Sequence, residues 1–141
     1  MKNKELELHK RYLEMTKIWS ENSYCERLKV GALIVKDSMI ISDGYNGTPK
    51  GFENVCEIPG ENITKSYVLH AEANAITKLA KSHNSSVGST LYVTHSPCLE
   101  CSKLIIQSEI TKVIYIDDYR NKDGIGLLKK ANIEVLQIKI D

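Results

Sequence analysis

The sequence predicts an α/β protein with a mixed β-sheet and helices on both faces of the sheet. After about residue 70, short β-branched segments alternate with segments of helical periodicity, a pattern typical of strands joined by helical crossovers. Before that point, two β-branched segments lie only three residues apart, which favours an antiparallel hairpin. The 141-residue chain contains no repeat, low-complexity tract or linker, so we expect a single domain over residues 1–141.

The N-terminal half of the chain contains one expected helix, one hairpin and one long loop. Residues 4–20 place apolar side chains among charged ones at helical spacing, as in an amphipathic helix. Residues 30–35 and 39–42 are rich in β-branched side chains and are predicted to form the two strands of the hairpin. Residues 44–59 are rich in turn-forming residues and predict a long, structured loop.

The C-terminal half alternates between helices and strands. We expect three helices, over residues 70–81, 98–107 and 124–131. We expect three strands, over residues 89–94, 112–116 and 133–138. Pro97 is predicted to occupy the first position of the second of these helices, because the missing N–H of proline costs nothing there.

The composition is that of an ordinary globular protein, with 42% apolar and 26% charged residues. Nineteen basic and 18 acidic residues leave a formal net charge of +1, which argues against a nucleic-acid partner but allows a small basic pocket for one phosphate. No segment approaches the roughly 18 apolar residues that span a bilayer, and residues 1–10 lack the apolar segment of a secretory signal. We therefore expect a cytoplasmic protein with no membrane partner, whose four cysteines are thiols or metal ligands.

Two short motifs predict a metal site. One is His-Ala-Glu at residues 70–72, and the other is Pro-Cys-Leu-Glu-Cys at residues 97–101. Cys98 and Cys101 lie one turn apart at the start of a predicted helix, where the helix dipole favours the thiolate that binds metal. With His70 they form a donor set that suits tetrahedral zinc, and three protein ligands leave the fourth position open to water. The motifs therefore predict one catalytic zinc ion.

Glu72 is the candidate catalytic residue. Zinc lowers the pKa of a bound water toward about 7, and a nearby carboxylate can accept that proton and deliver it elsewhere. Residues i and i+2 lie about 200° apart on a regular helix, so His70 and Glu72 converge only if His70 lies at the N-terminal end of its helix. A redox dithiol is the alternative interpretation of the two cysteines alone, but the combination with His-x-Glu is the signature of zinc nucleobase deaminases.

Together with the two zinc motifs, other segments of the chain carry a specific resemblance to a known family. The chain resembles the cytidine deaminase superfamily and, most closely, the deoxycytidylate (dCMP) deaminases, over nearly its whole length. The resemblance lies in residues 25–32, 44–49, 70–76 and 94–101. The zinc motifs are common to the superfamily, whereas Gly-Tyr-Asn-Gly-Thr-Pro at 44–49 and the helix that contains Asn74 favour dCMP deaminases over tRNA adenosine deaminases. The resemblance implies a three-layer α/β/α sandwich with a five-stranded mixed sheet and the two metal-binding helices side by side.

The resemblance also implies the reaction and the roles of several residues. The reaction would convert dCMP to dUMP and ammonia and so supply dUMP for thymidylate synthesis. Glu72 would protonate N3 of the cytosine ring and then carry a second proton to the departing ammonia. The backbone N–H of Ala71 would bind the pyrimidine O2, the carbonyl of Ser96 would accept from the 4-amino group, and Asn46 would hydrogen-bond the sugar.

The phosphate of such a substrate requires local positive charge. Arg27 is the first candidate, because arginine can form a bidentate pair with phosphate, and Lys29 and Tyr119 follow. The alternative for Arg27 is a solvated surface cation, as most of the 19 basic residues are expected to be.

Two departures from the family pattern concern Cys25, Cys56 and His95. Some relatives hold a second, structural zinc with the equivalents of Cys25 and Cys56 plus two histidines shortly before His70. This chain has no histidine between Glu57 and Leu69, so we expect no complete second zinc site and interpret the two cysteines as free buried thiols, with a partial or rearranged site as the alternative. His95 replaces a residue that is usually apolar; we expect it at a solvent- or interface-facing strand end, with tuning of the metal surroundings as the alternative.

The resemblance further implies a homo-oligomer, often a hexamer, and regulation by dCTP and dTTP at a site that involves Gly44, Tyr45 and Gly47. Two alternatives to a dCMP deaminase remain. The first is another deaminase on the same scaffold, acting on tRNA adenosine, a nucleoside, cytosine or guanine. The second is a zinc-binding module without catalysis, which Glu72 disfavours because a structural zinc site has no use for a carboxylate beside its ligands.

Overall fold

The computed structural model describes residues 1–141, which form four helices and five strands. In chain order these are α1 (Asn3–Ser20), β1 (Gly31–Lys36), β2 (Met39–Tyr45), α2 (Ala71–Ala80), β3 (Thr90–His95), α3 (Leu99–Gln107), β4 (Lys112–Asp117), α4 (Asp123–Lys130) and β5 (Glu134–Gln137). Every predicted helix and strand is present, with boundaries that differ by at most three residues.

The five strands form one mixed sheet in the order β2-β1-β3-β4-β5. Strand β1 is antiparallel to both β2 and β3, whereas β3, β4 and β5 run parallel to one another. The hairpin and the mixed sheet predicted from the sequence are therefore confirmed. The carboxyl ends of β3 and β4 lie together at one edge of the sheet, where ligands bind in many α/β proteins.

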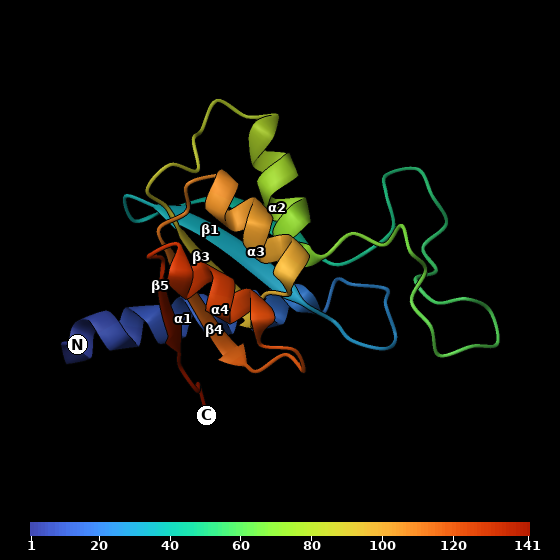
Figure 1. The fold of residues 1–141 in the computed structure, drawn as a ribbon, viewed down its shortest axis with the longest axis horizontal. Helices are drawn as coiled ribbons and strands as arrows, with labels where there is room; N and C mark the ends of the chain where they lie inside the picture. The colour runs from blue at the N-terminus through green and yellow to red at the C-terminus, as the bar shows by residue number, and fades with distance from the viewer.

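Helices cover both faces of the sheet, so the predicted three-layer arrangement is also confirmed. Helices α2, α3 and α4 lie on one face, and α1 lies on the other (Figure 1). Alternation along β1 shows the two cores: Ala32 and Ile34 pack toward α2–α4, while Leu33 and Val35 pack toward α1, against Leu13. Side chains that alternate along a strand point to opposite faces, which explains why the central strands are apolar at nearly every position.

Two local predictions need correction. The hairpin turn contains two residues rather than three, because Lys36 pairs with Met39; Asp37 and Ser38 both have positive φ angles, 50° and 63°, as a two-residue hairpin turn with the twist of the strands requires. Pro97 does not occupy the first helical position. Helix α3 begins at Leu99 and Cys98 is its N-cap, with the Cys98 sulfur accepting from the Cys101 N–H. The cysteine thus takes the capping role and leaves proline outside the helix.

The close packing of β2 on α2 positions the start of α2. A Cβ atom on Gly44 would lie 2.5 Å from the Ala71 carbonyl oxygen and 2.7 Å from the Ala75 nitrogen, so only glycine fits at this crossing. Between β2 and α2 the chain runs through residues 46–70, which project away from the sheet as the green loops of Figure 1. None of the four helices combines the length and the apolarity that crossing a bilayer requires.

A candidate zinc centre and substrate cavity

Three metal-binding side chains converge at the N-terminal ends of α2 and α3. His70 is the N-cap of α2, Cys98 is the N-cap of α3, and Cys101 lies in the first turn of α3. The Nδ1 atom of His70 lies 3.4 Å from the sulfur of Cys98 and 3.4 Å from the sulfur of Cys101. The three donor atoms all lie within 4.8 Å of one another. Helix packing therefore brings together residues that are about 30 positions apart in the sequence.

The donor geometry fits a zinc ion. With Zn–S bonds of about 2.3 Å and Zn–N bonds of about 2.05 Å, a tetrahedral ion separates a nitrogen from a sulfur ligand by about 3.6 Å. The observed 3.4 Å separations are close to this value. One imidazole nitrogen and two sulfurs form a borderline-soft donor set that zinc prefers, and it leaves one tetrahedral position open.

The electrostatics of the two cysteines favour a thiolate at this position. Hydrogen bonds from Cys101 and His70 lower the pKa of Cys98 to about 4. The thiol of Cys101 is the donor to that thiolate, so its own pKa is raised. The N-terminus of α3 adds the partial positive charge of a helix dipole. A cation at the centre of these groups would stabilise both sulfurs as thiolates.

Glu72 is buried beside the ligand group, with 4% of its surface exposed. His70 has extended backbone angles, φ −75° and ψ 157°, whereas Glu72 is the second residue of the helix proper. Because His70 lies outside the regular helix, the two side chains border the same cavity, which confirms the geometric condition set by the sequence. Burial raises the pKa of Glu72 to about 7, against the opposing effect of His70.

His70, Glu72 and Cys98 line a cavity of about 470 Å³. Its wall includes most of the residues that the sequence suggests for substrate binding: Arg27, Asn46, Ala71, Ser96 and Tyr119. Lys29 is exposed and does not line the cavity, so the structure does not bring it to the other predicted substrate contacts.

The side-chain amide of Asn46 hydrogen-bonds the backbone of residues 28 and 30 in the cavity wall. Its Oδ1 accepts a hydrogen bond from the Val30 N–H at 2.9 Å, and its Nδ2 donates to the Leu28 carbonyl at 2.8 Å. An amide group can make further bonds at both atoms, so these contacts leave one donor and one acceptor site for a ligand. Asn46 therefore shapes the loop around the cavity as well as lining it.

Ser96 and Tyr119 join the carboxyl ends of β3 and β4. The Ser96 N–H donates to the Asp117 carbonyl at 2.9 Å, and the Ser96 hydroxyl accepts from the Tyr119 N–H at 2.6 Å. Neither bond uses the Ser96 carbonyl. His95 precedes Ser96 at the end of β3 and is half-buried in the cavity wall, with Nδ1 2.9 Å from the Thr94 hydroxyl. It thus lies at a strand end, as expected, but it borders the cavity, and burial lowers the pKa of its imidazole.

The interpretation of Cys25 and Cys56 as free thiols is wrong. The structure joins them in a disulfide with Cα atoms 5.1 Å apart, within the range that disulfides need. Both cysteines are buried. The pairing depends on two loops that approach each other only in the folded chain, 31 residues apart in sequence, so the missing histidines, which led us to expect no complete second zinc site, could not exclude a disulfide.

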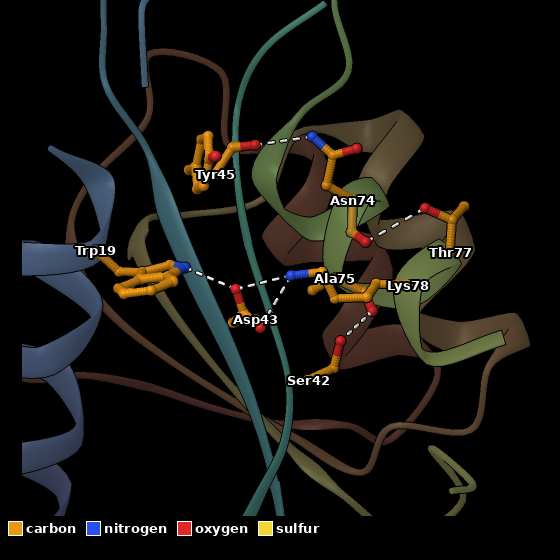
Figure 2. A network of polar contacts seen from close by, with 8 residues as sticks. All are labelled: Trp19, Ser42, Asp43, Tyr45, Asn74, Ala75, Thr77 and Lys78. Atoms are coloured by element: carbon orange, nitrogen blue, oxygen red, sulfur yellow. Dashed lines mark hydrogen bonds and ion pairs between the residues drawn. The ribbon is translucent and has the colours of Figure 1, made fainter. Parts of the chain in front are cut away.

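A second cavity, of about 550 Å³, lies between β2 and α2. Gly44, Tyr45 and Gly47 line it, together with three lysines: Lys50, Lys78 and Lys81. Figure 2 shows polar contacts that hold this region. Asp43 accepts from the Trp19 Nε1–H at 2.7 Å and pairs with Lys78 at 3.0 Å, so the carboxylate links α1 to α2 across β2.

The main cavity is also lined by three residues that were not predicted from the sequence: Arg120, Glu57 and Thr64. Arg120 directly follows Tyr119, and its position after β4 is the signal that could have identified it. Glu57 and Thr64 lie within the long connection between β2 and α2, where no periodic pattern predicts which side chains face the site.

A three-layer α/β/α fold with a His/Cys/Cys group at two helix N-termini and a buried glutamate beside it defines the class of zinc-dependent deaminases. The family profile described as the cytidine and deoxycytidylate deaminase zinc-binding region matches residues 6–117. The chain therefore belongs to this family, and it is a zinc-dependent deaminase, a hydrolase that acts on carbon–nitrogen bonds.

Individual proteins of this family are similar to the chain over most of its length. The chain is similar to the dCMP deaminase of cyanophage S-TIM5, whose crystal structure contains dCMP and dUMP, with a TM-score of 0.92 and 45% identity over 98% of this chain and 99% of that one. The deoxycytidylate deaminase of Enterobacteria phage T4 is 34% identical over 89% of this chain and 87% of its own length. ComE operon protein 2 of Bacillus subtilis is 34% identical over 92% of this chain and 70% of its own length.

Proposed function

We propose that this chain catalyses the hydrolytic deamination of dCMP to dUMP and ammonia. The observation that carries the proposal is the buried carboxyl of Glu72 in one cavity with His70 and Cys98, two members of the donor group that Cys101 completes. The choice of substrate is supported by the arginines in the same cavity and by the similarity to a deaminase whose structure contains dCMP and dUMP.

His70, Cys98 and Cys101 would hold one zinc ion per chain. When bound, the ion supplies Lewis acidity that lets a water molecule act as a nucleophile near neutral pH. Protein groups around the cavity carry the protons, orient the base and bind the phosphate.

Glu72 is the proton carrier of the proposed reaction. A carboxyl whose pKa is raised to about 7 can both accept and donate a proton near neutral pH. Glu72 takes one proton from the attacking water and delivers it to N3 of the cytosine ring as the water oxygen bonds to C4. It then takes the proton of the resulting hydroxyl group and passes it to the amino group, which leaves as ammonia when its bond to C4 breaks. Its burial keeps bulk water away from these transfers.

Two backbone groups orient the base. Ala71 is the first residue of α2, so its N–H lies outside the hydrogen bonds of the helix and can donate to the pyrimidine O2. The Ser96 carbonyl, held by the two bonds that Ser96 makes to the β4 side of the cavity, accepts from the 4-amino group. The second hydrogen-bonding site on each amide atom of Asn46 is available to the sugar.

The phosphate binds at the arginines. Arg27 and Arg120 both line the cavity, and Tyr119 lies beside Arg120 in the same wall. Arginine pairs with phosphate through parallel N–H bonds, which are among the stronger hydrogen bonds in proteins. The formal net charge of +1 means that this affinity must come from local groups rather than from the whole molecule.

Ammonia release from dCMP, dCTP, deoxycytidine and cytosine tests the proposal. We expect the highest kcat/KM for dCMP, a lower value for deoxycytidine because it lacks the phosphate, and little turnover of dCTP or cytosine. Absence of turnover on all four compounds by zinc-loaded protein would overturn the catalytic assignment. A preference for deoxycytidine over dCMP would overturn the assignment of the phosphate site.

Regulation, assembly and location form a further part of the proposal. We propose that dCTP and dTTP bind at the second cavity, since Gly44, Tyr45 and Gly47 line it with three lysines that suit a triphosphate. Asn46 borders both cavities, so a ligand in one could alter the other.

We also propose a homo-oligomer, such as a hexamer, in the cytoplasm. Light scattering with and without the two nucleotides, together with dCMP kinetics, tests the assembly and the regulation.

A further inference from the structure

The connection between α1 and β1 carries Arg27 and is held at several points by side chains from other segments. At its end, Asn46 binds the backbone of Leu28 and Val30. Nearer its middle, the Oε2 atom of Glu57 accepts from the backbone N–H groups of Glu26 at 3.0 Å and Arg27 at 3.2 Å. The backbone of Arg27 is therefore held by a carboxylate that lies 30 residues away in sequence.

Glu57 is itself part of a small folded unit. Residues 56–65, which we call the 56–65 hairpin, are closed by hydrogen bonds from the Ile58 N–H to the Ile63 carbonyl at 2.8 Å and from the Lys65 N–H to the Cys56 carbonyl at 2.7 Å. Glu57 lies opposite Thr64 in an antiparallel bridge. The disulfide of Cys56 attaches the hairpin to the connection that carries Arg27.

The same hairpin also contacts the side chain of Arg27. The Nη1 atom of Arg27 donates to the Thr64 hydroxyl at 3.1 Å. Arg27, Glu57 and Thr64 all line the main cavity. A guanidinium has five N–H donors, so this single bond orients the group and leaves most of its donors for an anion.

We propose that Glu57 is a positioning residue for nucleotide binding: it holds the backbone of Arg27 so that the guanidinium, steadied by Thr64, meets the substrate phosphate. This inference rests on the proposed function and deepens it, because it assigns the preference for a nucleotide over a nucleoside to the 56–65 hairpin. A binding group held in place before the ligand arrives loses less conformational freedom on binding.

Because Glu57 is negatively charged, the direction of the change in the KM for dCMP on its removal tests the inference. A carboxylate near a phosphate repels it, so removal of the charge alone would tighten the binding of dCMP. If Glu57 instead acts by positioning Arg27, its removal weakens the binding of dCMP. The two effects predict opposite changes in KM.

The experiment compares E57A with E61A, which removes an exposed carboxylate from the same hairpin. We expect E57A to raise the KM for dCMP about tenfold, as loss of a well-oriented charged hydrogen bond would, with kcat nearly unchanged. We expect kcat/KM for deoxycytidine to be unchanged, and E61A to match the wild type. In an R27A background, E57A should have no further effect on dCMP, because residues that act as one unit are not additive.

Three results would overturn the inference: a lower or unchanged KM for dCMP in E57A, an equal loss on deoxycytidine, or additive effects of E57A and R27A. If E57A does not fold, T64V provides the second test, because it keeps the shape of the side chain and removes only the acceptor for Arg27. For T64V we expect a smaller rise in KM than for E57A, and only with dCMP. An unchanged KM for dCMP in T64V would contradict the proposal. Calorimetry with dUMP and deoxyuridine gives the same comparison without turnover, so a failure of the deaminase assignment is distinguishable from a failure of the role of Glu57.

Discussion

Glu72 is the residue whose environment departs furthest from that of a surface carboxylate. It lies at the second position of α2, is 4% exposed and borders the same cavity as His70 and Cys98. A surface glutamate at this position would be a helix-stabilising charge in the first turn. Burial beside His70 makes it a group that can exchange protons with a ligand in the cavity.

Replacing Glu72 by glutamine should abolish most of the activity and leave zinc in place. We expect kcat for dCMP to fall by about 10²- to 10⁴-fold, the usual contribution of a general acid–base group, because the amide has nearly the same shape but cannot accept and release a proton near neutral pH. Steady-state kinetics and zinc analysis measure the two effects. E100Q, a substitution at an exposed residue of α3, is the control. Activity near the wild-type level in E72Q would mean that the proton carrier lies elsewhere.

Replacing Cys98 by alanine should instead remove the metal. Loss of one of the three donors leaves only two protein ligands, and catalytic zinc sites commonly have three. We expect substoichiometric zinc in purified C98A and a loss of activity that added zinc restores poorly, measured by metal analysis and ammonia release. One zinc per chain in C98A would contradict the assignment of the ligand.

At the scale of the structural elements, the loops on the substrate side are held by a few long-range attachments. Two of the connections that border the main cavity, residues 21–30 and 46–70, contain no helix and no named strand. The Cys25–Cys56 disulfide, Asn46 and Glu57 hold them together. These attachments restrict loops that would otherwise have a large conformational entropy.

Loss of the disulfide should therefore reduce stability and leave the metal-binding group intact. Closing a loop over a separation of 31 residues corresponds to about 3–4 kcal/mol in the chain-entropy model. We expect reductant to lower the free energy of unfolding of the wild type in urea and to leave a C25S/C56S variant unchanged. Thiol titration of unreduced, unfolded and chelated protein should find the two thiols of Cys98 and Cys101. Four thiols would show that the disulfide is absent.

At the scale of the whole molecule, the packing of α1 against the sheet buries an ionisable residue. His9 is 7% exposed, and its Nδ1 atom lies 2.8 Å from the hydroxyl of Tyr92 on β3. Burial lowers the pKa of the His9 imidazole below its usual 6.5. The folded state therefore holds this histidine neutral at a pH where the unfolded chain would already protonate it.

The free energy of unfolding should accordingly fall on mild acidification. Where the unfolded state binds more protons, stability rises with pH, so the contribution of His9 is present above about pH 6.5 and is lost as the pH falls toward its folded-state pKa. We expect H9Q to lose less stability than the wild type between about pH 7.5 and 5.5 in urea titrations. H83Q, at an exposed histidine, should keep the wild-type slope. Equal slopes for H9Q and the wild type would exclude this contribution.

Much of the fold could be predicted from local patterns. The β-branched segments and the amphipathic segments identified all nine elements, because period 2 and period 3.6 are properties of the chain itself. The boundaries were less certain, since helix ends depend on capping: Cys98, rather than Pro97, decides where α3 begins. The donor group was predictable because Cys98 and Cys101 share one turn and His70 precedes a helix.

The sequence by itself determined the α/β architecture and the residues on which the proposed chemistry depends, the His/Cys/Cys donor set and the glutamate near it, because these rest on residue types at short spacings. Only the tertiary structure decided which loops border the cavity, that Cys25 pairs with Cys56, that Arg120 joins Arg27 while Lys29 does not, and that Glu57 holds the backbone of Arg27. The physical reason is distance along the chain. Local geometry is set by neighbouring residues, whereas contacts between irregular loops 30 residues apart depend on the packing of everything between them.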